Sequence, residues 1–106
     1  MPSARPRRGE VWQVDLGLVA KSQPALVLGV PTEKTHQIYT FIPHTTSPLG
    51  TEFEVKIAVR FLKEGAFDAQ GIGTVPSVKF QRRLGELTAA QIRQVEDALL
   101  AWLEIE

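Results

Sequence analysis

The stretch Lys21-Ser22-Gln23-Pro24-Ala25-Leu26-Val27-Leu28 decides the fold, because polar residues give way within it to an almost continuous apolar run. The apolar part extends to Val30 and is rich in branched side chains, as expected of a strand that is buried on both faces. A proline is tolerated only at the first position of such a strand, where a missing backbone N–H does no harm. We therefore predict a central strand over residues 24–30, entered by a short polar segment.

The segment before this strand has the period-two pattern of a β-strand. In residues 10–16, the apolar Trp12, Val14 and Leu16 alternate with polar side chains, which indicates a strand with one buried face. The other segments that we expect to be extended are residues 37–43, 52–59 (the most regular alternation in the chain), 65–70 and 73–80.

The C-terminal segment changes to helical periodicity. Thr88 and Gln91 form a capping-box pattern, after which five apolar residues recur on one helical face. We expect a helix from about Ala89 to about Glu104, and a β-rich α+β domain that is either a small barrel or a curved antiparallel sheet. The residues of the apolar helix face are Ile92, Val95, Leu99, Trp102 and Leu103.

The composition is that of one small domain. A chain of 106 residues has room for a single core, which we place in residues 9–106, after a flexible basic arm at residues 1–8. Twelve basic and twelve acidic side chains cancel, so a nucleic-acid site must be a local patch. The sequence has no cysteine, no signal-peptide core and no apolar run of the roughly 20 residues that a membrane helix needs. We therefore expect a cytoplasmic protein that does not enter a membrane.

Most catalytic and metal-binding patterns are missing from the sequence. His36 and His44 are the only histidines, and neither has a cysteine or a carboxylate at ligand spacing. The glycine patterns of nucleotide-binding loops and the nucleophile elbow of serine hydrolases are also absent. We therefore expect neither a metal nor a cofactor.

Polar and charged residues instead gather at the ends of the predicted strands. In a small barrel these ends converge on one rim, where hydroxyl groups and cations can hold a ligand. Taken singly, each of these residues is also explained as an ordinary turn residue or a solvated charge. The residues at strand ends are Lys21, Ser22, Gln23, His44, Thr45, Thr46, Ser47, Gln70, Arg82 and Arg83.

Several segments, in the right order, resemble the MazF/PemK family of type II toxins from bacterial toxin–antitoxin pairs. Residues 8–16, RGEVWQVDL, are similar to the first strand of that family, and residues 24–28, PALVL, match its core strand. Residues 42–47, IPHTTS, and the FEV of residues 53–55 match its Val-Pro-x-Thr turn and the strand after it. The LGEL of residues 84–87 also fits, so the resemblance covers nearly the whole chain.

The resemblance implies an SH3-like barrel that forms a homodimer and cleaves single-stranded RNA without a metal. Such toxins are neutralised by a cognate antitoxin, whose C-terminal segment covers the RNA groove. Cleavage proceeds by attack of a ribose 2′-hydroxyl on the adjacent phosphate, which requires a proton acceptor, a donor to the leaving oxygen and positive charge near the phosphate. The family meets these needs largely with an arginine just before the core-strand proline and a threonine after the Val-Pro turn.

Carried over residue by residue, these two catalytic positions fall on Thr45 and Gln23. Thr45 matches the family, but Gln23 stands where the family has arginine, and a glutamine amide carries no charge. We therefore expect an impaired endoribonuclease. The resemblance and the strand ends together assign RNA contacts to Lys21, His44, Thr46, Ser47, Gln70, Arg82 and Arg83.

Three explanations of Gln23 are open: a substitution introduced so that a host survives a toxic nuclease, natural decay of the site, or a transfer of the missing charge to Lys21. Two other functions compete with the nuclease. One is a non-catalytic module that binds RNA or the antitoxin on the same barrel. The other is a purely structural subunit of a larger assembly.

Overall fold

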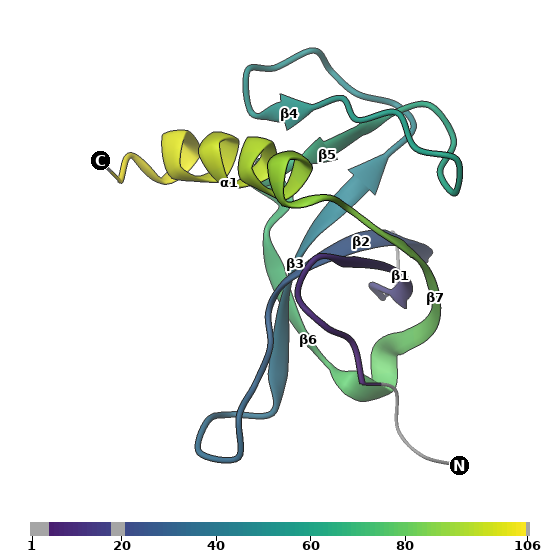
Figure 1. Cartoon of the computed structure of the whole chain (residues 1–106), viewed down its shortest axis with the longest axis vertical. Coiled ribbons are helices and arrows are strands. Elements are labelled where there is room, and N and C mark those ends of the chain that lie inside the picture. The colour runs from purple at the N-terminus through teal and green to yellow at the C-terminus, as the bar shows by residue number, and fades with distance from the viewer. Residues whose placement is uncertain (1–4, 18–20, 106) are drawn as a thin grey trace.

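One antiparallel sheet of seven strands carries the fold in the computed structural model, which describes residues 5–17 and 21–105. The strand order is β4-β5-β3-β2-β1-β7, and β6 pairs with β3 away from this path. The described strands curve without closing on themselves (Figure 1), so a curved antiparallel sheet is confirmed and a closed barrel is not formed. The elements are β1 (Glu10–Asp15), β2 (Ser22–Gly29), β3 (Ile38–Thr45), β4 (Glu54–Val55), β5 (Ala66–Asp68), β6 (Gly73–Pro76), β7 (Phe80–Glu86) and α1 (Ala89–Leu103), with short 3-10 turns η1 (Ala69–Gly71) and η2 (Ser77–Lys79).

β2 is the central strand that its sequence predicts. Leu26 packs into one hydrophobic cluster with Ile42 and Phe67, while Ala25 and Val27 pack into a second cluster. These three β2 residues are fully buried. Since β2 pairs with β1 on one side and with β3 on the other, burial on both faces explains its almost continuous apolar run.

The prediction of a long strand over residues 52–59 is wrong, because only Glu54–Val55 pairs with a neighbouring strand. The Glu54 carboxylate accepts backbone N–H hydrogen bonds from residues 49–51 at 2.6–2.9 Å, which hold the preceding chain in a turn. The rest of the segment has no strand partner, yet Ile57 still reaches the core. The alternation in the sequence therefore reflects contact with the core and not sheet pairing.

β7 has no clear signal in the sequence, although it pairs with β1 along the edge of the sheet. Most of its side chains are polar or exposed, so it lacks the apolar alternation that indicates a strand. The segments expected to be extended at 65–70 and 73–80 are present as β5 and β6, and each is cut short by a 3-10 turn.

α1 begins with the predicted capping box. The Thr88 hydroxyl accepts a hydrogen bond from the Gln91 backbone N–H at 3.2 Å, and the Gln91 side chain accepts one from the Thr88 N–H at 2.9 Å. On the predicted apolar face, Val95 is fully buried, and Ile92 and Leu99 pack against the same cluster. The helix thereby closes the core beside β4 and η1 (Figure 1).

The described part of the predicted N-terminal arm contacts the body of the domain. Pro6 is buried, and the Arg8 guanidinium donates to the Leu28 carbonyl at 3.0 Å and pairs with Glu96 of α1. Residues 1–4 of the arm lie outside the described residues. The last part of the arm thus bridges β2 and α1, while the division of the chain into arm and domain stays a prediction.

Candidate functional site

An open cleft of about 450 Å³ lies between β1, β2, β3, β7 and the loop from β4 to β5. Five of the nine residues predicted for the site line this cleft, so sheet formation brings together side chains that are far apart in the sequence. The five are Gln23, His44, Thr45, Thr46 and Arg82, and the other lining residues are Gln13, Ser22, Pro24, Phe61, Leu62, Lys63 and Leu84.

The register of the sheet explains this convergence. Gln13 of β1 stands opposite both Pro24 of β2 and Arg82 of β7, so three neighbouring strands contribute one row of side chains. Antiparallel pairing of β2 with β3 carries Gln23, at the start of β2, toward Thr45, at the end of β3. The two positions to which the resemblance assigns catalysis therefore share one cleft.

Thr45 lies in a fixed turn at the end of β3. Its Oγ1 accepts a hydrogen bond from the Ser47 backbone N–H at 3.0 Å, as in other hydroxyl-stabilised turns. A Cβ atom on Gly65 would overlap the Thr45 carbonyl oxygen, so only glycine lets the β4–β5 loop come this close. Because the hydroxyl oxygen accepts from Ser47, its proton is available for another acceptor. Thr45 can therefore donate a hydrogen bond to a ligand.

Two cations line the cleft. Arg82 and Lys63 are exposed, and neither forms an ion pair within residues 5–17 and 21–105. Arg82 is expected from the sequence, whereas Lys63 is not, because it lies on a loop whose path depends on tertiary contacts. No acidic side chain is among the described residues of the lining, so the local potential is positive.

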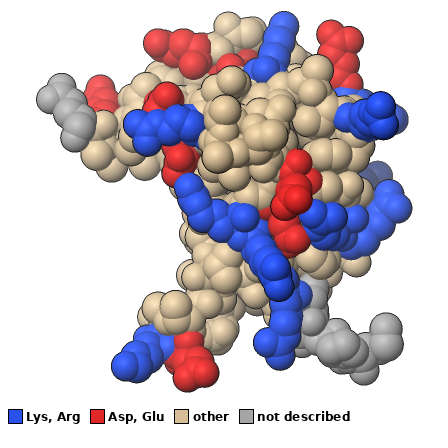
Figure 2. All heavy atoms as spheres, in the orientation of Figure 1, with Lys and Arg blue, Asp and Glu red and all other residues tan. Residues whose placement is uncertain are grey.

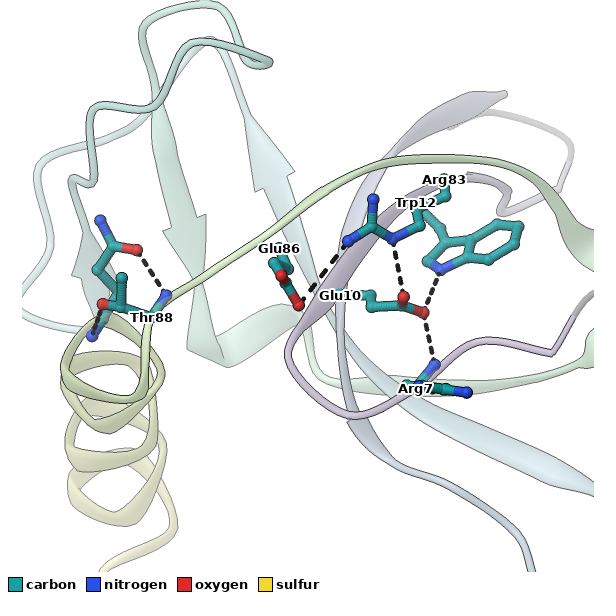
Figure 3. A network of polar contacts seen from close by, with 7 residues as sticks. Arg7, Glu10, Trp12, Arg83, Glu86 and Thr88 are labelled. Carbon is teal, nitrogen blue, oxygen red and sulfur yellow. Dashed lines mark hydrogen bonds and ion pairs between the residues drawn. The ribbon is translucent and has the colours of Figure 1, made fainter.

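Arg83 takes part in a different network, since successive side chains alternate between the faces of a strand. Its Nε donates to Glu10 Oε2 at 2.7 Å, and its guanidinium lies 3.7 Å from Glu86 (Figure 3). Glu10 also accepts hydrogen bonds from the Arg7 backbone N–H at 2.7 Å and from Trp12 Nε1 at 3.1 Å. Arg83 therefore does not line the cleft.

The protonation of Glu10 depends on this network. Partial burial by itself would raise the pKa of the Glu10 carboxyl group. The hydrogen bonds from Arg7, Trp12 and Arg83, together with the Arg83 charge, outweigh this effect and lower the pKa below its ordinary value. Ionised Glu10 thus ties the N-terminal segment, β1 and β7 together.

Three other predicted residues also lie outside the lining of the cleft. Lys21 is exposed in a left-handed conformation with φ of 52°, and its backbone N–H closes a turn onto the Gly17 carbonyl at 2.9 Å. Ser47 contributes a backbone N–H to the turn after β3. Gln70 lies in η1, where its N–H donates to Asp68 Oδ1 at 3.1 Å.

His44 is the buried polar residue of the cleft. It is 3% exposed, and its imidazole ring packs edge-to-face on Phe67 with ring centres 5.0 Å apart. Among the described residues, Nε2 has no hydrogen-bond partner. Burial lowers the pKa of the imidazole, so the ring is neutral at pH 7.

Charge elsewhere on the surface is mixed. Figure 2 shows Lys and Arg side chains in a band across one face, with Asp and Glu beside them. Ion pairs such as Arg93 with Asp97 on α1 neutralise part of this charge. Within the part of the chain that the structure describes, no group of three His, Cys, Asp or Glu side chains could hold a metal ion, and no helix is long and apolar enough to cross a membrane.

Solved structures of toxins share this fold. An endoribonuclease from a mycobacterial species, in complex with its cognate antitoxin, matches with a TM-score of 0.79 and 24% identity over 95% of this chain and 97% of that chain. The Mycobacterium tuberculosis toxin MazF-mt6 has values of 0.76 and 24% over 92% and 98% of the two chains. MazF from Deinococcus radiodurans has values of 0.79 and 21% over 96% and 99%. At these identities the similarity establishes the fold.

The sequence comparison reaches further than the fold. Residues 7–103 match the family described as the PemK-like, MazF-like toxins of type II toxin–antitoxin systems. The match spans every strand, the helix and all the residues that line the cleft. The resemblance in the sequence is thereby confirmed, and the chain belongs to the PemK-like, MazF-like toxin family of type II toxin–antitoxin systems.

Proposed function

We propose that this toxin is an endoribonuclease that cleaves single-stranded RNA in the cleft around Gln23 and Thr45. The observation that carries the proposal is the convergence of these two residues with Arg82, from three different strands. Cations and hydroxyl groups, with no carboxylate among the described lining residues, suit a phosphodiester. Proteins named as endoribonucleases are among the solved structures of the same fold.

The reaction that fits this cleft is attack of a ribose 2′-hydroxyl on the adjacent phosphate, which forms a 2′,3′-cyclic phosphate and releases a 5′-hydroxyl end. Negative charge builds on the phosphate oxygens in the transition state, where fixed donors and cations are most effective. Arg82 and Lys63 supply the charge. The Thr45 hydroxyl and the Gln23 amide supply neutral hydrogen bonds.

Gln23 makes this a slow enzyme. The arginine of the family is a charged donor, and a glutamine amide at the same place is a neutral one. Loss of one such donor costs about 10²–10³ in rate. Lys21 is not among the residues that line the cleft, so we assign the positive charge there to Arg82 and Lys63.

The partners of this protein follow from the same proposal. A cognate antitoxin covers the cleft, in keeping with the MazE–MazF and endoribonuclease–antitoxin complexes that share the fold. The positive potential of the cleft favours an acidic antitoxin segment. Because the RNA substrate is cytoplasmic, the toxin acts in the cytoplasm, as a homodimer.

Restoring the cation tests the proposal. In a gel assay on single-stranded RNA, Gln23→Arg should raise the cleavage rate by about 10²–10³ over the native chain, since it restores one charged transition-state donor. Adding Thr45→Ala to this variant should remove the gain. Gln94→Arg, which adds a cation at an exposed position of α1, is the matched control and should leave the rate unchanged. Absence of cleavage by Gln23→Arg would contradict the nuclease proposal.

A non-catalytic module that binds RNA or the antitoxin is the second candidate, and Gln23 itself is the observation that favours it. This candidate predicts that the native chain and Gln23→Arg bind single-stranded RNA and that neither cleaves it. The gel assay and a binding assay on the same oligonucleotide therefore separate the two functions.

A further inference from the structure

The proposed reaction needs a group that removes the proton from the 2′-hydroxyl, and few side chains of the cleft can do so. Arg82 and Lys63 are cations whose ordinary pKa values lie far above neutral pH. Thr45 and Gln23 carry no basic atom in the physiological range. Of the described lining residues, His44 alone has a side chain that is ordinarily able to gain and lose a proton near neutral pH.

The surroundings of His44 mark it as more than a packing residue. The residue is 97% buried, yet Nε2 has no hydrogen-bond partner among the described residues. A buried polar atom without a partner destabilises the fold and therefore calls for an explanation. The ring packs on Phe67, and a Cβ atom on Gly65 would come within 2.8 Å of His44 Cε1. Contacts on these sides fix the ring beside Thr45.

The two ring nitrogens differ in their access to the cleft. Nε2 is an enclosed atom without a hydrogen-bond partner among the described residues, whereas Nδ1 is not among the enclosed, unpartnered atoms of that part of the chain, and His44 lines the cleft. The neutral ring then carries its proton on Nε2 and presents the lone pair of Nδ1 to a bound ribose.

We infer that His44 is the general base of the cleft, an inference that rests on the proposed function. The 2′-hydroxyl proton passes to Nδ1 of His44 as the 2′-oxygen forms a bond to phosphorus. The bond from phosphorus to the 5′-oxygen breaks, and that oxygen takes a proton from solvent. His44 then returns its proton to solvent, so no other reactant is consumed.

The charges around His44 decide how the reaction depends on pH. Lys63 and Glu64 lie on the loop whose Gly65 comes close to the ring, Arg82 lies on β7 and Asp68 on β5. None of them hydrogen-bonds to the imidazole among the described residues, and burial is the cause that lowers its pKa. His44 is therefore unprotonated and active at neutral pH, and activity is lost as the pH falls through the lowered pKa.

Replacement of the imidazole tests this role in the Gln23→Arg background, where cleavage is fast enough to measure over a wide pH range. The rate should be flat at neutral pH and fall on acidification, with a midpoint below about 6.5. His44→Gln keeps a polar side chain but no base, and should lower the plateau rate at least about 100-fold, since general bases contribute about 10²–10⁴. The acid limb of the profile should also disappear.

The controls separate this inference from the proposed function. His36→Gln changes the exposed histidine of the β2–β3 turn and should leave the rate and the profile unchanged. Cleavage by His44→Gln within about threefold of its parent, with the acid limb retained, would show that His44 is not the base while the nuclease proposal stands. Failure of every variant, including Gln23→Arg, to cleave would overturn both.

A measurement on the native chain covers the case in which His44→Gln does not fold. The histidine ring resonances are followed by NMR while a 2′-O-methyl single-stranded RNA, which cannot react, is added to saturation. The inference predicts a shift of the His44 ring resonances and none for His36. Saturation of the cleft without any change at the His44 ring would overturn it.

Discussion

At the scale of single residues, the Glu10 carboxylate holds several donor groups together outside the cleft. Its side chain is 13% exposed and accepts hydrogen bonds from Arg7, Trp12 and Arg83 (Figure 3). A carboxylate held by several donors is stabilised in its ionised form. The contact with Arg83 matters most for the site, because it holds one arginine of the Arg82–Arg83 pair away from the cleft.

The lowered pKa of Glu10 predicts a stability that depends on pH. A depressed carboxyl pKa stabilises the fold above the unfolded-state pKa, and this contribution is lost as the pH falls through the folded-state pKa. Glu10→Gln should therefore lower the free energy of unfolding by about 1–2 kcal/mol at pH 7, the scale of a partly exposed charged hydrogen bond. Urea denaturation at pH 7 and at pH 3 measures this, and the difference between the two chains should be smaller at pH 3 than at pH 7. An equal difference at both pH values would exclude the ionised carboxylate as the cause.

Single residues also show which features of the site can be predicted from the sequence and which cannot. Thr45 and Gln23 could be located because they occupy fixed positions in the motifs of the family, and the structure brings both to one cleft. Lys63 could not be located, since loop residues show no periodic sequence pattern. Its position depends on how Gly65 packs against β3. The enclosed Nε2 of His44 is likewise a property of tertiary packing.

At the scale of elements, the sequence pattern predicted a helix or strand correctly where its apolar residues are buried and its backbone makes the expected hydrogen bonds. β2 is apolar because it is covered on both faces, and α1 was delimited by the capping box at Thr88. Residues 52–59 have the alternation of a strand without the partner, because Glu54 draws the preceding chain into a turn. β7 has the partner without the alternation, because three successive residues of the strand, Gln81 to Arg83, are exposed.

Because side chains alternate between the two faces of a strand, the adjacent Arg82 and Arg83 of β7 point to different surroundings. Arg82 faces the cleft opposite Gln13, and Arg83 faces the network of Glu10. Adjacent residues of the same chemistry thus have different surroundings. This makes them a matched pair for any measurement of RNA binding, since both changes remove one positive charge from the same strand.

At the scale of the whole molecule, the apolar surface indicates self-association. The C-terminal end of α1 leaves Trp102 40% and Leu103 46% exposed, and the Trp102 ring packs on Phe53 only along one edge. A domain of this size gains stability by covering such surface with a second copy. Light scattering at micromolar concentration should give about twice the monomer mass of 11.8 kDa. A monomer at every concentration tested would rule out the homodimer.

The whole molecule is also electrically neutral, with twelve basic and twelve acidic side chains. If the toxin binds RNA as proposed, the attraction must come from the local potential of the cleft, where Arg82 and Lys63 form no ion pair among the described residues. We therefore expect the RNA to bind in the cleft, through Arg82 and Lys63, and not through Arg83 on the same strand.

The most direct test is the affinity of a labelled 2′-O-methyl single-stranded RNA for Arg82→Gln and Arg83→Gln, measured by fluorescence anisotropy at several salt concentrations. Arg82→Gln should weaken binding about tenfold and lower the slope of log K against log salt by about 0.7, the value for one lost phosphate contact on a single strand. Arg83→Gln, checked for folding by circular dichroism, should bind within about twofold of the native chain. Equal losses in the two variants, or a larger loss in Arg83→Gln, would contradict the assignment of the cleft as the RNA site.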